Sequence, residues 1–173
     1  MIPRNATDLY NRGAAEWVTM FWDGRVAGSV ADGFTTPAGD DLPNGLDSVL
    51  AAQAMFPVES HGEMRGNPGD FDVDGKINEL SYPADDDFVA VWDGLMKRLM
   101  TVAEYQELFA AAYPDIPADR LGFEHAANAI ATYEATAFAF TNSPWSRYLA
   151  GETTALSDEA ERGAALFLGE AGC

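Results

Sequence analysis

Apolar residues recur three and four positions apart in each periodic segment of this chain, and this spacing constrains the fold more than any other feature. The clearest case is an apolar face that runs through Phe88, Val91, Trp92, Leu95 and Leu99. The spacing predicts helices over residues 46–56, 88–100, 101–113, 119–140 and 157–169. No segment shows the convincing alternation of apolar and polar residues that is typical of a half-buried strand. We therefore expect a mainly α fold.

Two long stretches rich in Gly, Asp and Pro, residues 28–45 and 60–87, predict long loops between these helices. Loops of this length are usually functional or disordered. Thr101 with Glu104 has the pattern of a capping box, which predicts that a helix begins at Thr101. Ser157 predicts another N-cap, and Gly169 predicts the end of the helix that follows it.

The charge balance excludes several classes of function. The chain of 173 residues has 28 acidic and 10 basic residues, and therefore a formal net charge of −18. Phosphate backbones would repel such a chain, so we expect no nucleic-acid partner. The apolar share of 47% is ample for a buried core, yet no stretch of 18 uncharged apolar residues exists. We therefore expect no membrane span, and the N-terminus has no apolar region typical of a signal peptide.

Cysteine usage excludes an internal disulfide, because Cys173 is the only cysteine. With only His61 and His125 beside it, a Cys/His zinc cluster is also excluded. A short helix and a small-residue turn precede Cys173, as they commonly precede the c-type haem motif C-x-x-C-H. An ordinary free cysteine is the alternative, and composition alone favours it.

One acidic segment has the spacing of a calcium-binding loop. Asp70, Asp72 and Asp74 precede Gly75 in the pattern D-x-D-x-D-G, which provides oxygen ligands at alternate positions. The twelfth position, where a bidentate Glu is expected, is instead Ser81. An acidic turn without a metal is therefore the favoured alternative.

Several short segments occur in a defined order along the chain. They are Arg4-Asn5-Ala6, Phe21-Trp22-Asp23-Gly24-Arg25, Gln53-Ala54 with Glu63-Met64, and the stretches 105–114, 129–134 and 142–157. Together with Arg162-Gly163 and Cys173, they resemble the bacterial di-haem cytochrome c peroxidase family, which includes the MauG-like enzymes. The resemblance covers nearly the whole chain, and the order and number of the segments carry it.

The resemblance implies catalytic roles for three residues. Glu63 matches the family's acid–base glutamate, which moves a proton between the two oxygens of bound peroxide, and Gln53 matches the glutamine beside it. Trp22 matches the tryptophan between the two haems, where an indole helps electrons pass. The alternatives are a solvated loop acid for Glu63 and a core aromatic for Trp22.

The resemblance also implies binding roles. Met64 would line the peroxide pocket, Arg4 and Arg25 could pair with haem propionates, and Asn5 matches a calcium ligand. Cys173 would begin the second haem motif. A surface salt bridge is the alternative for each arginine. His61 and His125 are interpreted as a loop histidine and a structural helix residue.

The resemblance implies a cytochrome c-like di-haem peroxidase fold that is truncated at both ends, because neither haem motif is complete. Residues 1–141 would belong to the N-terminal peroxidatic haem domain, with an insertion at 26–45, and residues 142–173 would begin the C-terminal electron-transfer domain. The implied enzyme holds two haems c and calcium in the periplasm. It would reduce hydrogen peroxide with electrons from a small cytochrome c or cupredoxin.

Three further expectations stay open at this point. One alternative function is a MauG-like oxidation of a protein or small-molecule substrate. Another, from a different class, is a haem-free helical module that binds calcium. A homodimer is the third expectation.

Overall fold

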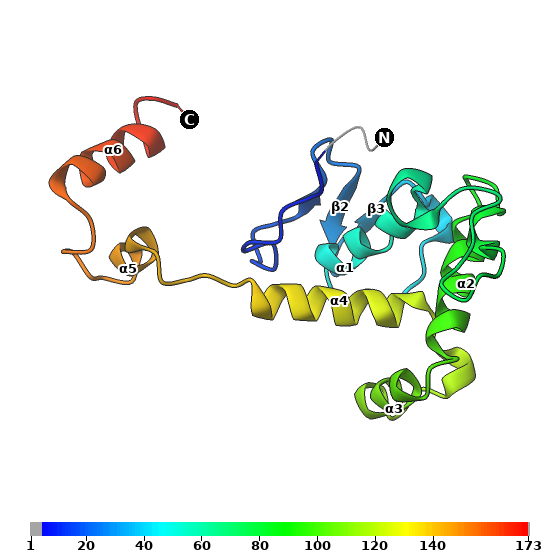
Figure 1. Cartoon of the computed structure of the whole chain (residues 1–173). Helices are drawn as coiled ribbons and strands as arrows, with labels where there is room; N and C mark the ends of the chain where they lie inside the picture. The colour runs from blue at the N-terminus through cyan, green and yellow to red at the C-terminus, as the bar shows by residue number, and fades with distance from the viewer. Residues whose placement is uncertain (1–4, 173) are drawn as a thin grey trace. The chain divides into compact units, whose positions relative to one another are not determined.

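The computed structural model describes residues 5–172, so the predictions for Arg4 and Cys173 lie outside the described residues. The fold is mainly helical, as predicted (Figure 1). Its α-helices are α1 (Val49–Ala54), α2 (Phe88–Leu99), α3 (Ala103–Ala112), α4 (Phe123–Ala137), α5 (Pro144–Leu149) and α6 (Asp158–Leu168). Short helical turns lie at Gly39–Asp41, Pro57–Glu59, His61–Arg65, Glu79–Ser81 and Ala118–Arg120.

A small antiparallel sheet, which the sequence analysis did not predict, precedes α1. Its strands, in spatial order, are β1 (Thr19–Met20), β2 (Val26–Ser29) and β3 (Gly33–Thr35). The expectation of a continuous loop over 28–45 was wrong, although the fold is mainly α as expected. The strands are two to four residues long, which is too short for an alternating pattern to appear. Position 28 of β2 also requires glycine, because a Cβ there would lie 2.1 Å from the Gly33 carbonyl oxygen. A glycine has no side chain to contribute to an alternating pattern.

Several helix ends differ from the sequence predictions. Thr101 does not cap α3, because its hydroxyl donates to the Arg98 carbonyl oxygen at 2.7 Å and the helix begins two residues later. α4 begins at Phe123, since Ala118–Arg120 forms a separate 3₁₀ turn. α5 was not predicted. Pro144 occupies its first turn, where a proline favours a helix start, and Ser143 caps it.

α1 is the centre of the core. All six of its residues are buried, and it packs against the small sheet on one side and α4 on the other (Figure 1). Trp92 of α2 joins this core, where its indole N–H donates to the Met55 carbonyl oxygen at 2.8 Å. Asn128 of α4 fixes the chain before α1, because it accepts from the Asp47 N–H and donates to the Gly45 carbonyl.

The chain forms two compact units, residues 1–138 and 139–173. The first contains the sheet and α1 to α4, whereas the second contains α5 and α6. None of the described residues from 139 to 172 is buried. The division falls close to the predicted domain boundary at 141, and the assignment of the units to two haem domains stays a prediction.

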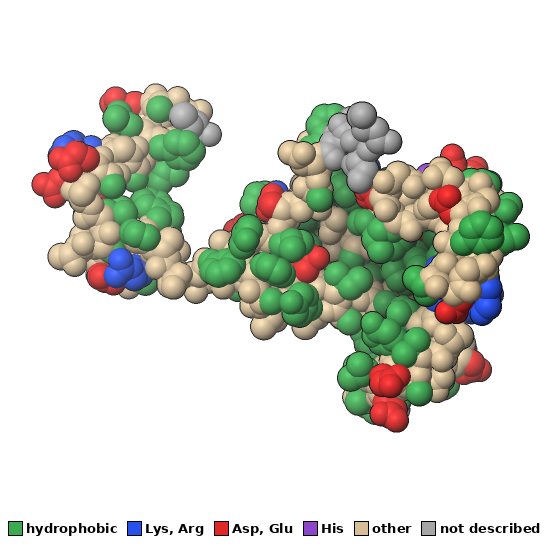
Figure 2. Space-filling model, in the orientation of Figure 1, with side chains coloured by type: hydrophobic (Ala, Val, Ile, Leu, Met, Phe, Trp, Pro, Cys, Tyr) green, Lys and Arg blue, Asp and Glu red, His purple; other side chains and the backbone are tan. Residues whose placement is uncertain are grey.

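The first unit has many apolar side chains at its surface, interspersed with acidic ones (Figure 2). Its large exposed apolar residues include Tyr10, Trp22, Val30, Met64, Phe71, Val73, Leu108 and Tyr133. Within residues 5–172, no helix is both long enough and apolar enough to cross a membrane.

Candidate functional site

Glu63 lies at the middle of a single π-helical turn, His61–Arg65. The backbone N–H groups of Glu63, Met64 and Arg65 all donate to the Ser60 carbonyl oxygen, at 3.0, 3.1 and 3.0 Å. The side chains of Glu63 and Met64 point outward and are exposed. Glu63 forms no side-chain hydrogen bond or ion pair with another described residue. This turn therefore presents an available carboxylate to solvent.

Arg65, the last residue of this turn, is only 1% exposed. Its guanidinium donates to the carbonyl oxygens of Leu80 (2.8 Å), Pro83 and Ala84 (3.4 Å). It also pairs with the Asp85 carboxylate at 3.3 Å. The planar fork of an arginine suits several acceptors at once, and here it joins the Glu63 turn to residues 80–85.

His61, the first residue of the turn, reaches the same carboxylate. Its Nε2 lies 3.1 Å from Asp85 Oδ1, and its Nδ1 bonds to the Gly66 carbonyl oxygen. Both ring nitrogens of His61 therefore have an oxygen partner within the chain. Gly66 has a φ of 76°, and a Cβ there would lie 2.8 Å from Asn78 Nδ2. Only glycine fits that position without displacement.

Glu59 lies beside the turn and was not identified from the sequence. Both of its carboxylate oxygens are shielded from solvent and lack a hydrogen-bond partner among the described residues. Burial raises the pKa of Glu59 from 4.5 to about 7. The Arg65 charge opposes this rise, and the Asp87 charge adds to it.

Gln53 and Glu63 are not joined by a hydrogen bond within the described part of the chain. Gln53 is buried in α1, and its side-chain amide donates to the Thr7 hydroxyl at 3.4 Å. Its predicted role beside peroxide stays a prediction. Asn5 is exposed at the start of the described chain, and its role at a calcium site likewise stays a prediction.

The segment Phe21-Trp22-Asp23-Gly24-Arg25 is the turn that joins β1 to β2. Phe21 has a φ of 63°, an uncommon value for a residue other than glycine, and Gly24 has a φ of 70°. Arg25 pairs with Asp23 at 3.0 Å and lies 3.9 Å from the centroid of the Phe21 ring. Trp22 is 67% exposed at this turn. As a described residue it is a surface indole rather than part of the core.

The three aspartates of the calcium-like pattern lie in a small hairpin closed by the Phe71–Ile77 bridge. Asp70 accepts from the Asn67 N–H at 2.7 Å, and Asp72 accepts from the N–H groups of Asp74 and Lys76. The carboxylates of Asp70 and Asp72 therefore accept hydrogen bonds from backbone N–H groups of the same turn. Within residues 5–172, no three acidic, His or Cys side chains are grouped to hold a metal. Calcium binding here stays a prediction, and this geometry favours the acidic-turn alternative.

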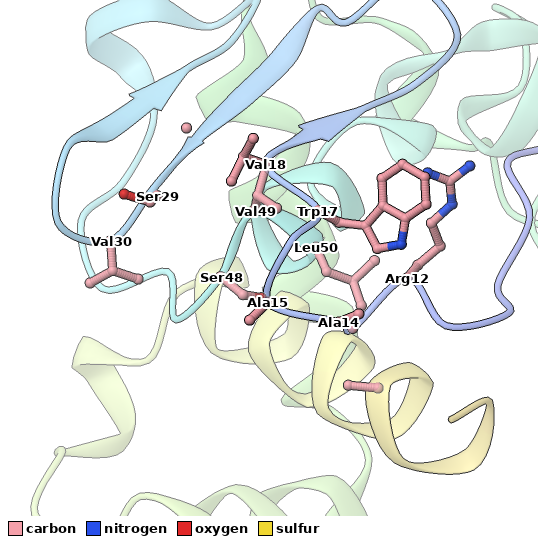
Figure 3. Close-up of a pocket in the computed structure, with 13 residues that line it drawn as sticks. Arg12, Ala14, Ala15, Trp17, Val18, Ser29, Val30, Ser48, Val49 and Leu50 are labelled. Atoms are coloured by element: carbon pink, nitrogen blue, oxygen red, sulfur yellow. The ribbon is translucent and has the colours of Figure 1, made fainter. Parts of the chain in front are cut away.

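A separate pocket of about 200 Å³ lies between residues 12–18, the β2–β3 turn and the start of α1 (Figure 3). The Arg12 guanidinium lies beside the Trp17 indole there, 4.1 Å from the ring centroid. None of the predicted site residues that the structure describes lines this pocket.

The chain belongs to the di-haem cytochrome c peroxidase family, whose model matches residues 1–154. Two curated relatives are similar to it. One is the methylamine utilization protein MauG of Methylorubrum extorquens, which is 31% identical over 109 residues, or 60% of this chain and 30% of MauG. The other is the cytochrome-c peroxidase IdrP1 of Denitromonas iodatirespirans, 40% identical over 127 residues, or 73% of this chain and 27% of IdrP1.

The chain thus spans less than a third of the length of these curated relatives. No solved structure matches it. Membership confirms the resemblance on which the sequence analysis depended, and the family implies haem cofactors.

The residues present do not fit the attachment of such a haem. A c-type haem needs two cysteines and an adjacent histidine, whereas Cys173 stands alone and outside the described residues. Both ring nitrogens of His61 have partners, and Nδ1 of His125 accepts from the Gly122 N–H at 3.1 Å. The role of the exposed Glu63 carboxylate in such an enzyme stays a prediction.

Sequence reasoning missed Arg65, Asp85 and Glu59. The position of Arg65 directly after Glu63-Met64 could have indicated a role beside Glu63. Its partners, however, lie 15 to 20 residues further along the chain. No local pattern predicts such contacts. The burial of Glu59 also results from tertiary packing.

Proposed function

We propose that this chain forms the peroxide-side part of a di-haem c-type peroxidase that reduces hydrogen peroxide to water. The observation that carries the proposal is the geometry of the Glu63 turn. Its Glu63 carboxylate has no side-chain partner among the described residues, and buried Arg65 fixes the turn to the rest of the unit. Family membership supports the reaction class. When bound, haem supplies the electron chemistry.

The work that falls to this chain is proton transfer. Reduction of peroxide to two waters consumes two electrons and two protons. Glu63 accepts the proton from the inner oxygen and donates it to the outer oxygen, so that the outer oxygen leaves as water. Glu63 ends this transfer as the carboxylate with which it began, and the two protons consumed overall come from solvent, to which the side chain is exposed. Gln53 would orient peroxide, and Met64 would line its site.

The remaining roles concern electron transfer and placement in the parent enzyme. Trp22, exposed on its turn, would help electrons pass, and Arg4 and Arg25 would pair with haem propionates. The electron donor would be a small cytochrome c or cupredoxin in the periplasm. Similarity to MauG supports one alternative, in which the oxidising equivalents act on a protein or small-molecule substrate.

A substitution of Glu63 tests this proposal in the longer, haem-loaded protein. We expect Glu63→Gln to lower peroxide turnover by about 100-fold or more, because the amide cannot carry the proton. Haem content, measured by pyridine haemochrome, should not change. The matched control is Glu104→Gln, an exposed glutamate of α3, which should leave turnover unchanged. Turnover by Glu63→Gln within twofold of the unmodified protein would overturn the role of Glu63.

A further inference from the structure

We propose that Arg65 is a positioning residue that holds Glu63 in place by tying its turn to residues 78–85. The inference deepens the proposed function and depends on it for the role of Glu63. Its structural half, that Arg65 fixes the turn, stands on contacts within this chain alone.

The turn has little to hold it from within. Three successive N–H groups share one acceptor, the Ser60 carbonyl oxygen, and residues Gly62, Glu63 and Met64 are exposed. Isolated π turns are uncommon and frequently lie at functional sites. A turn of this kind needs ties from outside to keep one conformation.

Arg65 supplies most of those ties. Its side chain donates to three backbone carbonyls between Leu80 and Ala84 and to the Asp85 carboxylate, while it is 1% exposed. Carbonyl acceptors belong to the backbone and cannot rotate away. The guanidinium therefore fixes the position of the turn relative to residues 80–85.

Two further contacts join the Glu63 turn to residues 78–85. Asn78 donates its side-chain amide to the Arg65 carbonyl oxygen at 2.8 Å, and His61 reaches Asp85 from the opposite end of the turn. Asp85 thus receives one bond from each end of the turn. Glu63 lies midway between the two residues that are held, so its backbone has little freedom to move.

Hydrogen exchange in the 173-residue chain tests the structural half. Arg65→Met should raise the exchange rates of the 63–65 amides at least tenfold, while the amides of α1 and α4 stay unchanged. The matched control is Arg98→Met, which removes an arginine that also contacts the 78–85 segment, through Asn78 and Glu79. It should leave the 63–65 amides within twofold of the original rates. Unchanged exchange in Arg65→Met would overturn the proposal.

A second variant covers the case in which Arg65→Met fails to fold. Asp85→Asn alters an exposed carboxylate and removes the charge that His61 and Arg65 share. It should raise exchange of the same amides about threefold or more, with helices α1 and α4 intact. Equal exchange in Asp85→Asn and the unmodified chain would contradict the proposal.

A double-mutant cycle in the haem-loaded protein separates positioning from a merely structural role. Arg65→Met should lower peroxide turnover at least tenfold when Glu63 is present, and less than twofold in the Glu63→Gln background. An equal loss in both backgrounds would overturn the positioning role. If Glu63→Gln itself turns over normally, the proposed function fails, and the exchange experiment still decides whether Arg65 fixes the turn.

Discussion

Buried Arg65 and half-buried Glu59 are two nearby ionisable residues with very different hydrogen bonding. Arg65 has an acceptor for its Nε and for both terminal nitrogens, whereas Glu59 has no hydrogen-bond partner for either oxygen among the described residues. A buried polar group without a partner costs stability, and a carboxylate in that position favours its neutral form. Glu59 should therefore be the residue through which pH acts most directly on this region.

The stability of the first unit should fall as pH rises from 5 to 8, in part because of Glu59. Its pKa is about 7 in the folded chain and near 4.5 when unfolded, so the folded state holds the proton more tightly between these values. Glu59→Gln should remove about 1–2 kcal/mol of that fall, a figure reduced for solvent screening of a half-buried group. Urea unfolding of both proteins at pH 5 and pH 8 measures it.

The control for this experiment is Glu107→Gln on the exposed face of α3, which should keep the pH dependence of the unmodified chain. An identical loss of stability from pH 5 to pH 8 in Glu59→Gln and in the unmodified chain would contradict the assignment.

At the scale of elements, most helices were predictable, whereas the strands and α5 were not. The twelve residues of α2 span three turns, so the repeat at 88, 91, 92, 95 and 99 placed its ends to within one residue. β1 to β3 are too short to show a repeat, and α5 has only six residues with Pro144 in its first turn. Glu63 was identified from a motif, but Arg65 acts through non-local contacts that no motif contains.

The junction between α4 and the chain before α1 depends on one amide side chain. Asn128 Oδ1 accepts from the Asp47 N–H at 2.9 Å, and Nδ2 donates to the Gly45 carbonyl at 2.8 Å. Asn128→Ala should lower the free energy of unfolding by about 1–2 kcal/mol, because two partners lose their bond at once. Asn142→Ala, at an exposed position, is the control. A loss below about 0.5 kcal/mol in urea unfolding would contradict this view.

At the scale of the whole molecule, stability is concentrated in one unit. Every described buried residue lies before residue 139, so α5 and α6 contribute no core of their own. In α6, which Ser157 caps, the apolar residues Leu166, Phe167 and Leu168 are exposed.

A chain that ends after residue 141 should therefore unfold like the original. We expect its thermal midpoint to lie within about 2 °C of that of the 173-residue chain, because the core is unchanged. Circular dichroism measures this directly, with α6 helicity lost from the signal. A fall of more than about 5 °C would mean that residues 142–173 stabilise the first unit.

The closed junction at Arg65 and Asn78 also has a consequence for redesign. Residues 67–77 leave and return at neighbouring points, because Asn78 bonds to the Arg65 carbonyl oxygen and the Asn78 N–H to that of Asp70. Val73, near the middle of this segment, is fully exposed. We therefore expect a spectroscopic label or an epitope placed at Val73 to leave the position of Glu63 unchanged, because both ends of the segment are held by hydrogen bonds.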